Sequence, residues 1–228
     1  YFAKPNELGY IDSLYFSVNG QSIKWEFDKE HIDICKLILN TPIKPGDSII
    51  ITTPFHVKLP SAKISRLGHL DQAYAITQWY PKPAVFDREG WHPMPYLNQG
   101  EFYSEFGSYD VKITLPKNYV LAATGDRIDE AEEEAWILTK SEETKKMISE
   151  KKYSNDNSFP KSSQEYKTIQ FKQYRVHDFA WFADKRFHVL KGNIILPRSG
   201  KTIDTWAFFT NNEIELWSNS IEYINDAT

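Results

Sequence analysis

The sequence has one cysteine, no hydrophobic run of membrane-spanning length and no excess of positive charge. Because Cys35 has no second cysteine to pair with, an intrachain disulfide and a zinc site built from several cysteines are excluded. No apolar run approaches the roughly 20 residues that a transmembrane helix needs, so no transmembrane segment is expected. The 27 basic and 31 acidic side chains give a net charge of −4, which argues against a nucleic-acid partner.

Common catalytic and metal-binding motifs are missing as well. The 6 histidines form no HExxH motif, and no pair of them has metal-ligand spacing with a carboxylate nearby. His177 and Asp178 could act as a base and its orienting carboxylate, but neighbouring residues on a strand point to opposite faces. Cys35 lies in an apolar strand pattern, as expected for a small buried residue rather than a nucleophile. We therefore expect no catalytic residue and no metal ligand in this chain.

Aromatic residues, by contrast, are abundant. The 228 residues include 7 Trp, 13 Tyr and 14 Phe, together 15% of the chain. Such enrichment favours strands, large cores and adhesive grooves. The length fits one large all-β domain, or one domain and part of another.

Strand patterns recur along most of the chain. Asn19-Gly20 between two apolar-aromatic runs predicts a hairpin with a type I′ turn over residues 10–26. Residues 109–115 alternate, which places Tyr109, Val111, Ile113 and Leu115 on one face of a strand. Further strands are predicted within 34–40, 48–60, 72–80, 118–125, 168–176, 177–187, 188–197 and 202–210, with a turn at 44–47.

Residues 81–108 are rich in proline, glycine and aromatics and show little periodicity. A structureless loop of this length is uncommon in a compact domain and is often functional. Its carboxylates next to aromatic rings allow a glycosidase site or a sugar-binding groove, whereas packing against a neighbouring domain is the favoured interpretation. The carboxylates are Asp87, Glu89, Glu101 and Glu105, and the rings are Trp91, Tyr96, Phe102 and Tyr103.

The charged segment 127–166 is predicted to be a solvated surface excursion. We expect a short strand or turn near Trp136 and a helix over about 142–152 capped by Ser141. Its charges alternate in sign, which argues against a dedicated docking site.

A helix is predicted at the C-terminal end, over residues 212–226. Thr210 and Glu213 have the spacing of a capping box. Ile214, Trp217, Ile221 and Ile224 fall at helical intervals on one face.

Several motifs in combination resemble one family. They are Thr77-Gln78 after a strand, Phe86-Asp87 in the long loop, Tyr109-Asp110-Val111, Ala123-Thr124-Gly125 and the segment 176–184. Together they resemble the N-terminal β-domain of gluzincin zinc metallopeptidases of the alanyl aminopeptidase and leukotriene hydrolase type, in a bacterial branch. The resemblance covers roughly residues 40–228, and residues 1–40 are similar to middle strands of the same domain.

The resemblance implies a saddle-like β-sandwich over residues 1–200, interrupted by the charged, partly helical excursion. Residues 201–228 would begin the zinc-bearing catalytic domain. With Tyr1 as the first residue and a helix at the last, both ends are expected to lie within a longer protein. Zinc would be held by an HExxH motif and a downstream Glu beyond residue 228, so this chain would hold no cofactor and be non-catalytic by itself. The partners implied are its own downstream catalytic domain and a peptide substrate, and the bacterial relatives imply export.

In this family a Gln-x-Glu or Gln-x-Gln motif lines the site for the first substrate residue, and its second polar residue binds the free α-amine. Gln78 matches the first position, whereas Tyr80 stands at the second, where it departs from the pattern. A phenol forms a hydrogen bond but carries no charge at neutral pH. Either another carboxylate compensates or the substrate preference differs. The alternatives are a stand-alone β-sandwich that binds sugar or protein through residues 81–108, and a scaffold protein that has lost its zinc ligands.

Overall fold

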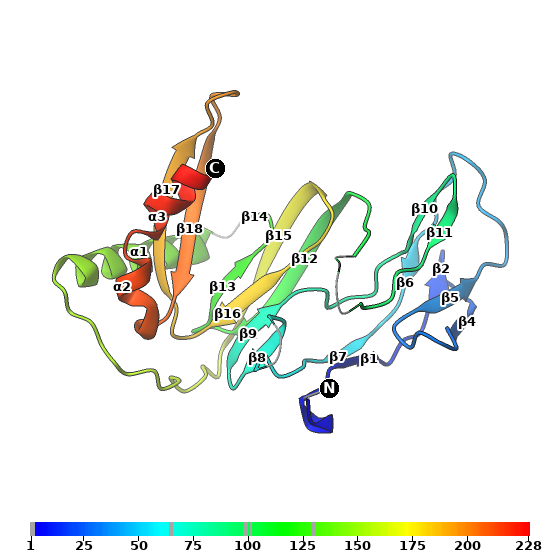
Figure 1. Ribbon diagram of the computed structural model, residues 1–228, viewed down its shortest axis with the longest axis horizontal. Coiled ribbons are helices and arrows are strands. Elements are labelled where there is room, and N and C mark those ends of the chain that lie inside the picture. The colour runs from blue at the N-terminus through cyan, green and yellow to red at the C-terminus, as the bar shows by residue number, and fades with distance from the viewer. Residues whose placement is uncertain (1–2, 64–65, 98–99, 101, 129–130) are drawn as a thin grey trace. The chain divides into compact units, whose positions relative to one another are not determined.

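The computed structural model describes residues 3–63, 66–97, 100, 102–128 and 131–228 (Figure 1). The chain forms two compact units: unit 1 comprises Tyr1–His69, Ile76–Gly107 and Arg175–Asp178, and unit 2 comprises Leu70–Ala75, Ser108–Tyr174 and Phe179–Thr228. Strands make up 37% of the structure and helices 17%, which confirms a β-rich fold.

Unit 1 consists mainly of small antiparallel sheets. The turn predicted at Asn19-Gly20 is confirmed, with the positive φ values of 49° and 82° that a type I′ turn needs. The hairpin is shorter than the predicted range of 10–26, because residues 10–12 and 24–27 pair with other strands. The pairs are β1 (Tyr10–Asp12) with β7 (His56–Lys58), β2 (Ser17–Val18) with β3 (Gln21–Ser22) and β6 (Ile51–Thr52), and β4 (Lys24–Phe27) with β5 (Cys35–Ile38). A short 3-10 helix, η1 (Pro5–Glu7), precedes β1.

The long loop predicted over 81–108 contains a hairpin, which the sequence analysis missed. β10 (Val85–Asp87) pairs with β11 (Gly90–His92), and only Arg88 and Glu89 connect them. Asp87 Oδ1 accepts a hydrogen bond of 2.8 Å from the Glu89 backbone, and Gly90 has a φ of 107°. Each strand is too short to show periodicity, so turn chemistry was the only local signal.

The longer strands belong mainly to unit 2, and they confirm the strands predicted within 109–115, 118–125, 168–176, 188–197 and 202–210. The strand predicted over 177–187 is shorter, since it covers only Trp181–Asp184. In β12, Ile113 and Leu115 are buried, Tyr109 and Val111 are half-buried, and the residues between them are exposed. The sheet orders are β12 (Gly107–Pro116)–β15 (Tyr166–Val176)–β14 (Asp126–Arg127), β13 (Val120–Ala123)–β16 (Trp181–Asp184)–β9 (Ala73–Ile76)–β8 (Gly68–Leu70), and β17 (His188–Ile195)–β18 (Thr202–Phe209).

The charged segment forms one long helix, α1 (Ala131–Ser149), instead of a strand near Trp136 followed by a shorter helix. Trp136 lies inside α1, and Ser141 is in its middle rather than at its N-cap. Alanine, leucine, glutamate and lysine are strong helix formers, and Glu132, Glu133 and Glu134 in the first turn complement the helix dipole. The prediction near Trp136 was wrong because this favourable composition extends the helix toward its N-terminal side.

The helix α1 also covers the open edge of β17, so it is not a solvated excursion (Figure 1). Ser141 Oγ accepts a hydrogen bond of 3.1 Å from the Lys191 backbone, and Thr144 Oγ1 accepts one of 3.2 Å from the Val189 backbone. Both hydroxyl side chains are buried. They satisfy N–H groups that a third strand would otherwise pair.

The predicted C-terminal helix is divided into η2 (Asn211–Glu213), α2 (Ile214–Trp217) and α3 (Ser220–Ala227). The capping box is not formed, because the Thr210 side chain makes no cap hydrogen bond. The apolar face is present: Ile214 is buried, and Ile221 and Ile224 pack on a cluster that includes Phe209. The predicted domain boundary at residue 200 lies between the paired strands β17 and β18, within unit 2. The assignment of residues 201–228 to a following domain stays a prediction.

Candidate functional site

Gln78 and Tyr80, the two predicted substrate-binding residues, lie in unit 1 just after β9. The strand ends at Ile76, so the strand predicted over 72–80 is shorter than expected. Gln78 has a φ of 52°, in the left-handed region that only a few per cent of non-glycine residues adopt. Backbone conformations of this kind are costly and concentrate at functional sites. The turn at Gln78 re-directs the chain before it reaches Tyr80.

Tyr80 is hydrogen-bonded to a carboxylate from a distant part of the chain. Its hydroxyl donates to Asp178 Oδ1 over 2.9 Å, and Lys82 Nζ lies 3.2 Å from Asp178 Oδ2. The side chains of Lys82 and Asp178 are 21% and 25% exposed, so the carboxylate is accessible to solvent on one side. All three residues belong to unit 1. The site thus combines a phenol, a carboxylate and an ammonium group.

Aromatic packing holds Tyr80 in this position. The Trp79 ring packs edge to face against the Tyr80 ring, with the ring centroids 5.3 Å apart. The Phe55 ring packs in turn against Trp79, with the centroids 6.1 Å apart. The Lys82 ammonium lies 5.8 Å from the centroid of the Tyr80 ring. These contacts limit the rotation of the phenol and aim its hydroxyl at Asp178.

The sequence pairs Asp178 only with its neighbour His177, as a candidate orienting carboxylate for a histidine base. His177 instead packs its ring against Phe106, at 5.8 Å between centroids, while Asp178 binds Tyr80 and Lys82. The structure therefore does not bring His177 and Asp178 together as a base and its orienter. No local pattern could have found the Tyr80–Asp178 pair, because 98 residues separate its members.

Among the described carboxylates of the 81–108 segment, Asp87 and Glu89 pair with neighbouring residues. Asp87 Oδ1 lies 2.8 Å from His92 Nε2, and this bond, together with the Glu89 backbone N–H, lowers the pKa of Asp87. Glu89 lies 3.3 Å from Arg88, and both are exposed. Glu101 lies outside the described residues. Asp87 and Glu89 are therefore held by ion pairs within the β10–β11 hairpin.

The outer face of the β10–β11 hairpin displays two aromatic rings. Phe86 and Trp91 are directly opposite each other, with 62% and 66% of their surfaces exposed and ring centroids 4.9 Å apart. Their planes are tilted by 55°, so they do not form one flat platform. Val85, on the other face of β10, is buried.

The described residues offer no second site of metal or thiol chemistry. They contain no group of three or more His, Cys, Asp or Glu side chains placed to hold a metal ion. Among these residues, no helix has the length and apolarity to cross a membrane. Cys35 is half-buried in β5, and burial raises the pKa of its thiol, which disfavours the thiolate.

Comparisons with protein-family models, with curated proteins and with solved structures find no significant match to this chain. The resemblance to the gluzincin N-terminal domain therefore depends on its motifs. Thr77-Gln78 follows β9, Phe86-Asp87 lies in β10, and Gly125 follows β13. Gly125 has a φ of 93°, and a Cβ there would lie 2.4 Å from the Lys172 carbonyl oxygen, so the glycine of the Ala-Thr-Gly motif is required sterically.

Proposed function

We propose that this chain is the non-catalytic N-terminal domain of a zinc-dependent metallopeptidase, specifically an aminopeptidase, and that it forms one wall of the substrate site. The proposal includes a saddle-like β-sandwich over residues 1–200 and a catalytic domain that begins at residue 201. Export from the cytoplasm is part of the same proposal. The support comes from the sequence motifs and from one contact in unit 1.

That contact is the hydrogen bond between Tyr80 and Asp178. The family pattern expects a polar or acidic residue at position 80 to bind the substrate amine, and this chain has a phenol there. Asp178 supplies a carboxylate 2.9 Å from that phenol, as the compensation hypothesis requires. A carboxylate is the side chain that best binds a protonated α-amine. Lys82 neutralises part of this charge, so a substrate ammonium would have to share Asp178 with Lys82 or displace it.

The residues of this chain would bind and orient the amino end of the peptide. Zinc, in the domain that follows, would polarise the scissile carbonyl of the substrate and activate the attacking water. Gln78 would fix the position of the first substrate residue, since its left-handed backbone sets the direction in which the chain leaves β9.

Zinc analysis and hydrolysis assays on the intact protein test this proposal. We expect bound zinc and cleavage of alanyl-4-nitroanilide, with Gln78→Ala reducing turnover and leaving thermal unfolding nearly unchanged. Gln21→Ala, at an exposed glutamine of β3, is the matched control and should retain wild-type kinetics. An intact protein that binds no zinc and cleaves no aminoacyl substrate would overturn the proposal, and unaltered kinetics of Gln78→Ala would remove Gln78 from the site.

The exposed pair Phe86 and Trp91 favours a second candidate, a stand-alone binding module. The tilt of 55° between their planes suits an irregular protein surface better than a flat sugar ring. In that case the intact protein would cleave no peptide, and a bound protein partner would be lost from Trp91→Ser. Hydrolysis of aminoacyl substrates together with unchanged partner binding by Trp91→Ser would exclude the module.

A further inference from the structure

A pocket of about 520 Å³ lies entirely within unit 2, bounded by β13, β14, α1, β15 and β18. Its volume is in the range of small-molecule sites, about 300–1,000 Å³. Phe171, Trp206 and Phe208 form aromatic walls, and small residues such as Ala122 and Ala131 leave the space open. An apolar ligand body could therefore pack against rings on several sides.

Carboxylates outnumber cations around this space. Asp126, Glu134 and Asp204 line the pocket, whereas Arg127 is the cation in its lining. Asp126 and Asp204 are both exposed residues, so their carboxylates can be reached from solvent. The lining is therefore acidic as well as aromatic.

The indole of Trp206 already interacts with two cations of the protein. The Arg127 guanidinium lies 4.9 Å and the Lys191 ammonium 4.8 Å from its ring centroid. Glu134 binds Arg127 over 2.8 Å, and Asp204 binds Lys191 over 2.8 Å. Each cation is thus held by a carboxylate against an aromatic face, which is the arrangement that recognises organic cations elsewhere in proteins.

The state of Lys191 reflects this acidic environment. Burial lowers the pKa of its ammonium group, but the hydrogen bond and the charge of Asp204, with a further contribution from Glu134, outweigh burial and raise it. These two carboxylates therefore stabilise the positive charge of Lys191. With Lys191 added to the cations, the described residues around the pocket still include three carboxylates and two cations.

We propose that this pocket binds an organic cation: an ammonium or guanidinium group on an aliphatic or aromatic body, as in a lysine or arginine side chain or a free amine. The apolar body would pack against Phe171 and Phe208, and the cationic group would bind Asp126 and Asp204 at the exposed side. An anion would instead meet three carboxylates, while Arg127 is already paired with Glu134. The ligand cation would bind Asp126 and share Asp204 with Lys191. The site is independent of the peptidase proposal, because none of its residues belongs to the Tyr80–Asp178 site.

Isothermal titration calorimetry of the intact protein tests this assignment. The probes are phenethylamine, its uncharged analogue 2-phenylethanol, and the blocked peptide acetyl-Gly-Lys-Gly-amide. We expect the amine to bind at least about tenfold more tightly than the alcohol, as charge-assisted hydrogen bonds predict. Tighter binding of the peptide than of the free amine would identify a side chain as the ligand, and the reverse would identify a small amine; both outcomes support the assignment.

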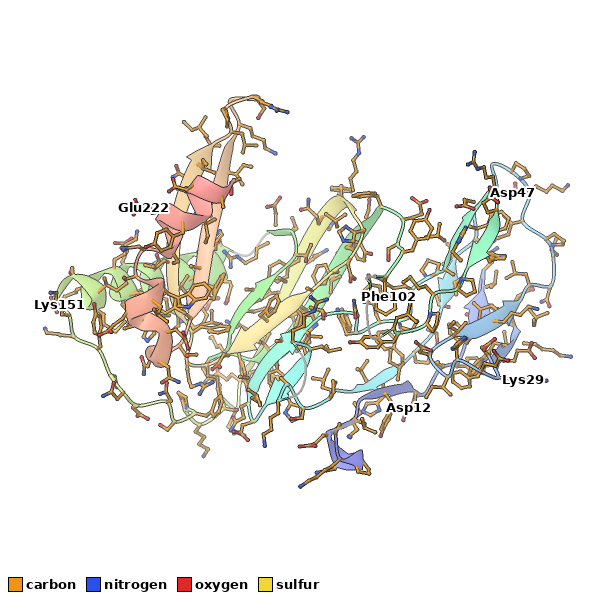
Figure 2. The ribbon with its side chains drawn as sticks, viewed as in Figure 1. Asp12, Lys29, Asp47, Phe102, Lys151 and Glu222 are labelled. Atoms are coloured by element: carbon orange, nitrogen blue, oxygen red, sulfur yellow. The ribbon has the colours of Figure 1, made fainter. Side chains whose placement is uncertain are left out.

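Variants locate the site. Asp126→Asn and Asp204→Asn should each weaken amine binding about tenfold. Glu222→Gln, at an exposed residue of α3 outside the pocket, removes the same charge and should leave binding unchanged (Figure 2). Equal affinity for phenethylamine and 2-phenylethanol, no measurable binding of either cation, or equal losses in all three variants would overturn the proposal.

Discussion

Tyr80 donates a hydrogen bond of 2.9 Å to Asp178, a residue 98 positions later in the chain. The same carboxylate lies 3.2 Å from Lys82 Nζ. The hydrogen bond thus joins the uncharged phenol of Tyr80 to the carboxylate of Asp178. Under the peptidase proposal, Tyr80 would therefore act together with Asp178, although it departs from the family motif by itself.

Asp178→Asn in the intact protein should raise the KM for substrates with a free α-amine by about tenfold, because it removes the negative charge and keeps the shape. Tyr80→Phe should raise it less, by about two- to fivefold, since Asp178 keeps its charge. Steady-state kinetics on alanyl-4-nitroanilide measure both effects.

The control for this experiment is Asp12→Asn, which alters an exposed carboxylate of unit 1 that pairs with His56. It should leave KM unchanged. If Asp178→Asn retains the wild-type KM while Gln78→Ala loses turnover, Asp178 has no role in amine binding although the peptidase proposal remains valid.

Local sequence rules predicted the elements whose stability is local. The Asn19-Gly20 hairpin follows from turn chemistry, and the alternating pattern in β12 follows from burial on one side of a sheet. The β10–β11 hairpin was not predicted, because strands of three residues are too short to show alternation of apolar and polar residues. Asp87 and Gly90, which are typical turn residues, were the local signal for it.

Tertiary contacts account for what the sequence did not predict. Helix α1 is anchored to β17 by hydrogen bonds to the hydroxyls of Ser141 and Thr144. In the sequence these two residues look like ordinary polar residues of a charged segment, so the contact with β17 could not be predicted from them. Asp178 and Lys82 likewise join Tyr80 only through the fold. Gln78 and Tyr80 were found through a family pattern, which records contacts that periodicity cannot detect.

Thr144→Val should destabilise the protein by about 1–3 kcal/mol, because it leaves the buried Val189 N–H without an acceptor while keeping the side-chain volume. Thr139→Val is the matched control: Thr139 is on the exposed side of the same helix and its hydroxyl bonds only the Ala135 carbonyl. Chemical denaturation of both variants gives the comparison. Equal losses would show that helix propensity, and not the bond to β17, is responsible.

Gly192→Ala should destabilise unit 2 by about 1–3 kcal/mol, as expected for overpacking. A Cβ at Gly192 would lie 2.3 Å from Ile221 Cγ2, so α3 would have to move away from β17. Ile221→Ala removes the opposing methyl group. In a double-mutant cycle the two substitutions should therefore be less destabilising together than the sum of their separate effects. Strict additivity would place the clash elsewhere.

Tyr119 should ionise far above the ordinary range of tyrosines. Its side chain is buried and its hydroxyl donates to the Gln72 carbonyl over 3.1 Å. Burial, reinforced by Tyr74, raises the pKa of Tyr119 from 10.0 to about 12. Because the folded state keeps this proton where the unfolded state loses it, Tyr119 stabilises the fold below pH 10 and loses that contribution as the pH rises toward 12.

Tyr119→Phe tests this linkage. Absorbance titration at alkaline pH should lose one late-ionising phenol in the variant. The difference in unfolding free energy between wild type and variant should shrink as the pH rises from 9 to 11, on the order of one proton of linkage. Tyr15→Phe, at an exposed tyrosine with 62% of its surface accessible, is the matched control and should leave the pH dependence of stability unchanged. A difference that does not change with pH would mean that Tyr119 has the same pKa in the folded and unfolded states, and it would contradict this prediction.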